Sequence, residues 1–273
     1  MTQKTKLALS CAALALGALS VRGQTPVPAA PAPETPVPVA AAPSSSWTLT
    51  PSLVTDYMFR GVRLGGFSFE PNIEFDSGNL GLGIWANIPL SDKVVGQSAP
   101  EIDPYGYYTI TLNDSTSLVP GFTWYNYPNA KTANGFYKAT FEPNLALNYT
   151  VGGVKFTPKV YYDFVLQGAT LEVTAAFALP LKDAGTELDF AATLGTYKWK
   201  AAIPDVSPDI ENRGDYFQFG VSAPFTVSKD SKLIIGVAYV EGSNNSFTQA
   251  GVRSDNTAAV GRVVGTLSYA ITF

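Results

Sequence analysis

Apolar and polar residues alternate along the chain from Trp47 to Phe273, and no stretch shows a convincing helical period. The last segment is the clearest, because Val263, Leu267, Tyr269 and Ile271 share one face while mostly serine, threonine and alanine fill the other. A β-strand with one apolar face has this period of two. The pattern therefore predicts an all-β chain.

The same alternation predicts twelve strands. They cover residues 47–60, 68–77, 80–89, 102–113, 116–127, 136–151, 154–166, 169–181, 186–200, 214–227, 231–242 and 259–273. Many of them exceed the roughly 5–6 residues usual in globular proteins and match the roughly 9–11 residues that a tilted membrane strand needs.

The connections between the predicted strands differ at the two ends. Those after even-numbered strands are tight, as at Gly78-Asn79 and Gly152-Gly153, where glycine and asparagine supply the positive φ of a short hairpin. Those after odd-numbered strands are mostly longer, with 167–168 as the exception. This asymmetry predicts an antiparallel transmembrane β-barrel of twelve strands. A soluble β-sandwich, which also alternates and has tight turns, is the alternative.

Aromatic residues gather near the ends of the predicted strands. Those that we assign to a girdle at the membrane surface are Tyr57, Phe59, Trp124, Tyr197 and Trp199. Amphipathic rings prefer this level of a membrane, so we expect these side chains to face outward.

The N-terminal segments differ in composition from the barrel, which we assign to residues 47–273. Residues 1–23 combine Lys4 and Lys6 with an apolar stretch up to Val21, the pattern of a secretory signal peptide. Residues 24–46 are rich in proline and alanine and predict a flexible, extended linker. This linker is either a simple tether or an arm that binds the cell wall or another partner.

Composition excludes several classes of chemistry. The sequence has no histidine, and its one cysteine, Cys11, would leave with the signal peptide. Histidine-based triads, thiol chemistry and most transition-metal sites are thereby removed, so we expect no metal and no cofactor. A pI near 4.9 argues against nucleic acid as a partner, since that needs a basic face.

Two short motifs resemble features of a known family. The segment Asp56-Tyr57-Met58-Phe59-Arg60-Gly61 resembles the "DY-x-FRG" opening strand of the TorF-type porins of bacterial outer membranes. Tyr269, Ile271 and Phe273 resemble the C-terminal signal that the outer-membrane assembly machinery recognises. Arg63 and the run Leu64-Gly65-Gly66 depart from the family pattern. The resemblance implies a pore in the cell outer membrane of a Gram-negative bacterium and names no solute.

Charged residues on the polar face of the strands are candidates for a lumen. They are the acids Asp56, Glu70, Glu74, Asp76, Glu142, Asp163, Glu172, Glu187 and Asp189, and the bases Arg60, Lys138, Lys155, Lys159 and Arg262. The acidic excess predicts a weak preference for cations. Arg60 needs a partner on a neighbouring strand, for which Glu70, Glu74 and Asp76 are candidates. The charges either brace the barrel as an ion-pair network or form a constriction that selects solutes.

We therefore predict a narrow channel for the passive diffusion of small hydrophilic solutes or ions, in contact with outer-membrane lipid, and not an enzyme. A non-conducting structural or adhesive barrel is the alternative. Same-face carboxylate pairs, Glu74 with Asp76 and Glu187 with Asp189, would permit glycoside cleavage, but any barrel with acidic strands contains such pairs. The acidic loop 201–213 fits simple solvation as well as a divalent cation.

Overall fold

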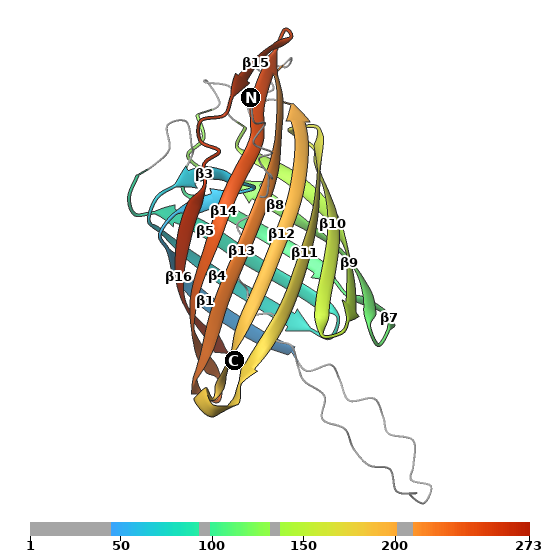
Figure 1. Ribbon diagram of the computed structural model, residues 1–273, viewed down its shortest axis with the longest axis vertical. Helices are drawn as coiled ribbons and strands as arrows, with labels where there is room; N and C mark the ends of the chain where they lie inside the picture. The colour runs from blue at the N-terminus through green and yellow to red at the C-terminus, as the bar shows by residue number, and fades with distance from the viewer. Residues whose placement is uncertain (1–44, 93–98, 132–136, 201–209) are drawn as a thin grey trace, which may run out of the picture.

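A single antiparallel sheet of twelve wall strands closes on itself as a barrel (Figure 1). The computed structural model describes residues 45–92, 99–131, 137–200 and 210–273. The wall strands are β1 (Ser45–Val54), β4 (Ser68–Ser77), β5 (Leu80–Pro89), β6 (Glu101–Tyr108), β8 (Thr116–Asn126), β9 (Ala139–Val151), β10 (Val154–Asp163), β11 (Gly168–Leu181), β12 (Thr186–Lys200), β13 (Ile210–Ser228), β14 (Ser231–Gln249) and β16 (Arg262–Thr272). The predicted barrel and its strand count are confirmed. The sandwich alternative is wrong, because all the wall strands belong to one closed sheet.

The N-terminal predictions lie almost wholly outside the described residues. The signal peptide, residues 1–23, and the linker, residues 24–46, fall there except for Ser45 and Ser46. These two serines already belong to β1. The barrel thus starts two residues before the expected boundary.

Closure of the barrel joins β1 to β16. Thr48 lies opposite Thr272 and Ser52 opposite Ser268. The paired hydroxyl oxygens are 3.1 Å and 2.8 Å apart. Two short strands extend the wall, β7 (Ile110–Asn113) beside β8 and β15 (Val252–Asp255) beside β14. The long connection predicted between strands 231–242 and 259–273 is therefore wrong in part, since β14 continues to Gln249 and forms a hairpin with β15.

The tight turns gather at one end of the barrel. Gly152 and Gly153, with φ of 58° and 81°, form the two-residue turn between β9 and β10. The 3-10 turn η2 (Lys182–Ala184) connects β11 to β12 and ends at Gly185 in a left-handed conformation. These turns and the C-terminus lie at the lower end in Figure 1, whereas β15 lies at the upper end.

The first predicted strand, 47–60, is wrong at its C-terminal end. β1 stops at Val54, which pairs with Ser68 at the start of β4. Residues 55–67 leave the wall between them and form a separate two-stranded sheet, β2 (Tyr57–Phe59) and β3 (Val62–Gly65). Figure 1 shows β3 near the upper end of the barrel. We call residues 55–67 the inner hairpin, since its contacts, described below, lie across the barrel interior.

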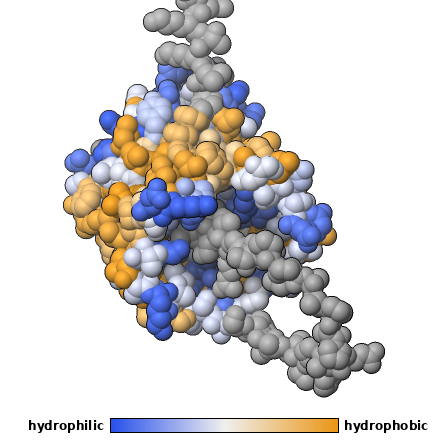
Figure 2. All heavy atoms as spheres, turned by 60° about the horizontal axis from the view of Figure 1, so that its bottom comes forward, coloured by the Kyte–Doolittle hydropathy of each residue, from blue (hydrophilic) through white to orange (hydrophobic). Residues whose placement is uncertain are grey.

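Side-chain exposure follows the predicted alternation. Leu171 and Val173 of β11 are 55% and 45% exposed, whereas Glu172 between them contacts tyrosines inside. Every wall strand carries large exposed apolar side chains. In Figure 2 apolar residues gather over the outer wall, and hydrophilic ones are scattered around the end turned toward the viewer. No helix among the described residues is long and apolar enough to cross a membrane.

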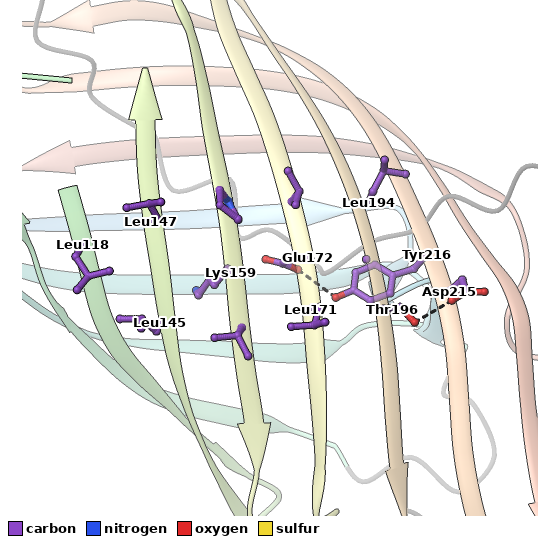
Figure 3. A pocket seen from close by; sticks show the side chains of 14 residues that line it. Leu118, Leu145, Leu147, Lys159, Leu171, Glu172, Leu194, Thr196, Asp215 and Tyr216 are labelled. Carbon is purple, nitrogen blue, oxygen red and sulfur yellow. Dashed lines mark hydrogen bonds between the residues drawn. The ribbon is translucent and has the colours of Figure 1, made fainter. Parts of the chain in front are cut away.

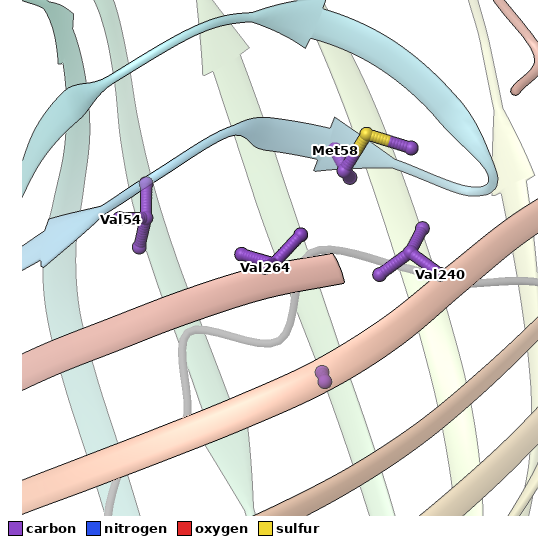
Figure 4. Close-up of a cluster of buried hydrophobic side chains, with 5 residues drawn as sticks. Val54, Met58, Val240 and Val264 are labelled. Carbon is purple, nitrogen blue, oxygen red and sulfur yellow. The ribbon is translucent and has the colours of Figure 1, made fainter. Parts of the chain in front are cut away.

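A small apolar cluster holds one side of the inner hairpin. Met58 of β2 packs with Val54, Ala238, Val240 and Val264, which come from β1, β14 and β16 (Figure 4). All five are at most 9% exposed. The hairpin is thus anchored to the wall beside its own origin before its tip reaches the opposite side.

Candidate functional site

The tip of the inner hairpin is held by one charged contact. The two terminal nitrogens of Arg60 donate to the two carboxylate oxygens of Glu142 on β9, at 2.7 Å and 2.8 Å. Arg60 is 2% exposed and Glu142 is 1% exposed. The Tyr125 hydroxyl donates a further hydrogen bond to the same carboxylate at 3.0 Å. Such a forked, charge-assisted pair fixes both partners in one orientation.

Aromatic rings surround the same guanidinium. Its central carbon lies 4.7 Å from the ring centroids of Phe59 and of Tyr161, and 5.3 Å from that of Trp199. Cations are attracted to ring faces within about 6 Å. We call the four wall residues Tyr125, Glu142, Tyr161 and Trp199 the Arg60 socket.

The backbone at the tip is strained to place Arg60 there. Arg60 has a φ of 48° and Gly61 a φ of 76°, so the turn needs the left-handed region twice. A residue other than glycine in that region costs about 1–3 kcal/mol. Burial alone would lower the pKa of Arg60, but the facing Glu142 carboxylate raises it, and the net pKa lies above its ordinary value. The guanidinium therefore stays charged inside the barrel.

A close approach shows how far the hairpin reaches. A Cβ atom at Gly242 on β14 would collide with the carbonyl oxygen of Gly61. Contacts of the tip with β9, β10, β12 and β14 place the hairpin across the interior. The hairpin therefore narrows the lumen toward the upper end.

Further polar contacts hold the hairpin stem. The Tyr57 hydroxyl donates to Glu101 on β6 at 2.8 Å. Within the hairpin, Arg63 pairs with Asp56 at 2.6 Å. The Arg63 backbone N–H also donates to the carbonyl of Ala258 at 2.8 Å. The hairpin is thus fixed at its stem, at Met58 and at its tip.

A second polar network lies toward the lower end. The Tyr105 hydroxyl contacts Glu74, and the Tyr107 hydroxyl lies 3.1 Å from both Glu74 and Asp76. The rings lie over Gly83 and Gly81 of β5, where any side chain would collide with them. Glycines on one strand thereby make room for tyrosines on the next, and the tyrosines orient the carboxylates.

A third network lies on β10 to β13. The hydroxyls of Tyr161 and Tyr216 both donate to Glu172. The Lys159 ammonium lies 4.6 Å from the Tyr161 ring centroid. Neither Lys155 nor Lys159 forms an ion pair within 4.0 Å among the described residues.

Most charged residues assigned to a lumen from the sequence lie on the inner face of their strands. These are Glu70, Glu74, Asp76, Glu142, Lys155, Lys159, Asp163, Glu172, Glu187 and Asp189. Asp56 and Arg60 belong to the inner hairpin, and Lys138 and Arg262 are exposed at the upper ends of β9 and β16. The proposed partners of Arg60 are wrong. Glu70 instead accepts a hydrogen bond from Asn87, and Glu142 pairs with Arg60.

Two buried acids were missed. Glu101 and Asp103 of β6 are 4% and 3% exposed, and both face the interior. Glu101 accepts hydrogen bonds from Tyr57 and Tyr127. They alternate with outward-facing Ile102, so the period of two was the signal that could have placed them. Among the described residues, no cluster of three or more potential ligand side chains could hold a metal ion.

The predicted aromatic girdle is largely wrong. Tyr57, Tyr197 and Trp199 are 4%, 2% and 8% exposed, and Phe59 packs against Trp199, so these rings fill the interior. Of the five, Trp124 is exposed, at 50%. The outward aromatic row instead contains Phe122, Phe141, Phe164 and Tyr162, with neighbouring centroids 5.4–6.2 Å apart. Of the C-terminal motif, Tyr269 and Ile271 lie on β16, and Phe273, just past its end, is 74% exposed.

An open groove of about 600 Å³ crosses β8 to β13. Half of its lining residues are leucine and valine of the outward face, among them Leu145, Leu171 and Leu194 (Figure 3). A hydrogen bond of 2.9 Å from Thr196 to Asp215 borders it, and both side chains are on the outer face. The groove therefore lies mainly over the outer wall, but Lys159, Glu172 and Tyr216 of the third network also contribute to its lining.

Together these features define a closed twelve-stranded barrel with an apolar outer wall and a polar interior crossed by a hairpin. The chain belongs to the family described as "Bacterial protein of unknown function (Gcw_chp)", whose profile matches residues 40–269. No curated protein sequence matches the chain.

Several solved structures are similar to this chain over most of its length. The NanC porin has a TM-score of 0.49 and 9% identity over 82% of this chain and 98% of that chain. The KdgM porin has a TM-score of 0.47 and 12% identity over 84% and 99%. LpxR from Salmonella typhimurium has a TM-score of 0.47 and 11% identity over 83% and 100%. At these scores the barrel assignment rests on the strand pairing of this chain itself.

Proposed function

We propose that the protein is a narrow outer-membrane channel for the passive diffusion of small hydrophilic solutes or ions, without enzymatic activity. The observation that carries the proposal is the division of the wall into an apolar outer face and an inner face of charged and hydroxyl side chains. A closed barrel of this kind satisfies its backbone hydrogen bonds within the sheet and presents a mainly apolar face to lipid. The likeness of residues 56–61 to the TorF-type porins supports the same reading.

A weak cation preference is part of the proposal. Inward acids include Glu70, Glu74, Asp76, Glu101 and Asp103, and none of them pairs with Lys or Arg within 4.0 Å among the described residues. Lys155 and Lys159 are the facing bases, on the inner side of β10. Carboxylates along a pore favour cations.

A non-conducting barrel is the second candidate, and the inner hairpin is the observation that favours it. The hairpin crosses the interior and is held by buried contacts at its stem and tip. In that case the barrel would act as an anchor or a surface structure. We propose in either case that membrane lipid and the outer-membrane assembly machinery are partners, and that the linker is a tether or contacts the cell wall.

Single-channel recording in a planar bilayer tests the proposal. We expect discrete conductance steps and, in a salt gradient, a reversal potential of the sign that cation preference gives. Absence of conductance from protein that migrates as a folded, heat-modifiable barrel would favour the non-conducting barrel. A water-soluble mature chain would refute the membrane location.

A further inference from the structure

The Arg60 socket is built entirely by the wall. Tyr125 lies on β8, Glu142 on β9, Tyr161 on β10 and Trp199 on β12. Their positions follow from sheet pairing, because Asn144, two residues from Glu142, lies opposite Tyr161, and Tyr161 lies opposite Thr170. The socket combines a forked carboxylate with aromatic faces, which together suit a planar delocalised cation.

Arg60 fills this socket imperfectly. Its backbone is in the left-handed region, and its Nε atom has no hydrogen-bond partner although it is buried. Two wall groups are also buried without a partner among the described residues: the indole N–H of the socket residue Trp199, and the hydroxyl of Thr170, which lies opposite Tyr161. Buried polar groups are normally paired, so the unpaired Nε shows that Arg60 is imperfectly accommodated, and the two wall groups mark recognition capacity that the hairpin leaves unused.

We propose that the Arg60 socket is a binding site for small guanidinium compounds and that Arg60 occupies it as a competitor carried by the chain itself. This deepens the proposed channel and rests on it, since a solute must enter the lumen to reach Glu142. Guanidinium fits the fork of Glu142 as the Arg60 side chain does, and the unused Thr170 and Trp199 groups suit a polar substituent on the solute. An alkylammonium of similar size lacks the fork and should bind more weakly.

The test empties the socket and adds the ligand back. Arg60→Gly removes the guanidinium and suits the φ of 48° at this position. Guanidinium chloride at millimolar concentration is then titrated against an equal concentration of sodium chloride. Tryptophan fluorescence reports binding, since Trp199 lines the socket, and block of the single-channel current reports occupation of the lumen.

The control variants are Arg60→Gly with Glu142→Gln, which removes the carboxylate, and Arg63→Ala, which removes the other hairpin arginine and leaves the socket filled. We expect Arg60→Gly to bind guanidinium saturably, and both controls and the wild-type protein to bind it at least tenfold more weakly. In the wild-type protein and in Arg63→Ala the tethered Arg60 side chain competes at a high effective concentration. Methylammonium should compete poorly. Equal responses in Arg60→Gly and in the double variant would overturn the proposal.

Two outcomes separate the socket from the channel. Saturable binding to a folded protein that never conducts would support the socket and refute the channel. Conductance in which Arg60→Gly shows no guanidinium effect would refute the socket alone. If Arg60→Gly does not fold, refolding with and without guanidinium replaces the titration. Recovery of the heat-modifiable band in guanidinium but not in sodium then supports the site, and equal yields contradict it.

Discussion

The guanidinium of Arg60 and the carboxylate of Glu142 meet inside the barrel from positions 82 residues apart in the chain, with both side chains almost fully buried. Breaking a buried ion pair by removing one partner costs about 3–5 kcal/mol, because the other charge is left uncompensated. We expect Glu142→Ala to lower the free energy of unfolding in urea by about this amount.

The matched control for that measurement is Glu211→Ala. Glu211 pairs with Lys198 at 2.7 Å, but these side chains are 41% and 69% exposed. Exposed pairs contribute less than about 1 kcal/mol. Equal losses in the two variants would mean that Arg60 is not buried against Glu142 in the folded barrel.

Gly242 sets the distance between the hairpin tip and β14. In Gly242→Ala the new Cβ atom would collide with the Gly61 carbonyl oxygen. Because neither atom can rotate away as a flexible side chain would, the hairpin must shift. We expect a larger or more variable single-channel conductance. Gly220→Ala is the control, because its nearest neighbour is the Ala238 Cβ at 3.5 Å, an ordinary contact. The idea that the hairpin sets the bore fails if Gly242→Ala conducts like Gly220→Ala.

The carboxylates of β4 predict the direction of a change in ion selectivity. Glu74 and Asp76 lie on the inner face beside the Tyr107 hydroxyl. Neutralising both, in Glu74→Gln with Asp76→Asn, should lower the cation-to-anion permeability ratio and move the reversal potential toward zero. The control is Asp183→Asn, which alters an exposed acid in the turn η2 and should leave the reversal potential unchanged. An increased cation preference in the double variant would contradict the assignment of these acids to the lumen.

The outer wall predicts a strong penalty for charge. Leu171 is 55% exposed and lies between the other outward leucines and valines of β10 to β12. Arginine on a lipid-facing strand costs about 2–4 kcal/mol near the bilayer midplane. We expect Leu171→Arg to reduce the free energy of folding into liposomes by this amount. Val252 lies on β15 at the upper end and is 72% exposed, so Val252→Arg should have little effect on that free energy. Comparable folding of the two variants would mean that this face does not contact lipid.

The wall could be predicted because a strand of a closed barrel repeats with a strict period of two, visible in every segment. Leu171, Glu172 and Val173 show it directly, since alternate side chains face lipid and lumen. The tight turns follow from the same local rules, as at Gly152-Gly153, where backbone φ alone demands glycine.

The period of two does not give the inner hairpin, although it breaks there: Val54 and Met58 fall on the otherwise polar face of the predicted strand. What turns the chain inward is a set of distant contacts, above all Glu142 and Trp199, which only the closed sheet brings together. The pair Arg60-Gly61 was a possible local sign of a turn. Tyr197 and Trp199 share the inner face with Thr193. Strict use of the period would therefore have placed them inside, although amphipathic rings near strand ends suggest a girdle at the membrane surface.

The pairing of β1 with β16 imposes an order on folding. The inner hairpin follows β1 directly, whereas the residues that hold its tip lie on β8 to β14. While the wall is still open, most of the hairpin's contact residues are not yet in place, and the hairpin remains unpacked beside β1. Joining the two edge strands then encloses it, so a chain that closes with the hairpin left outside is trapped and must reopen a whole seam to correct the error.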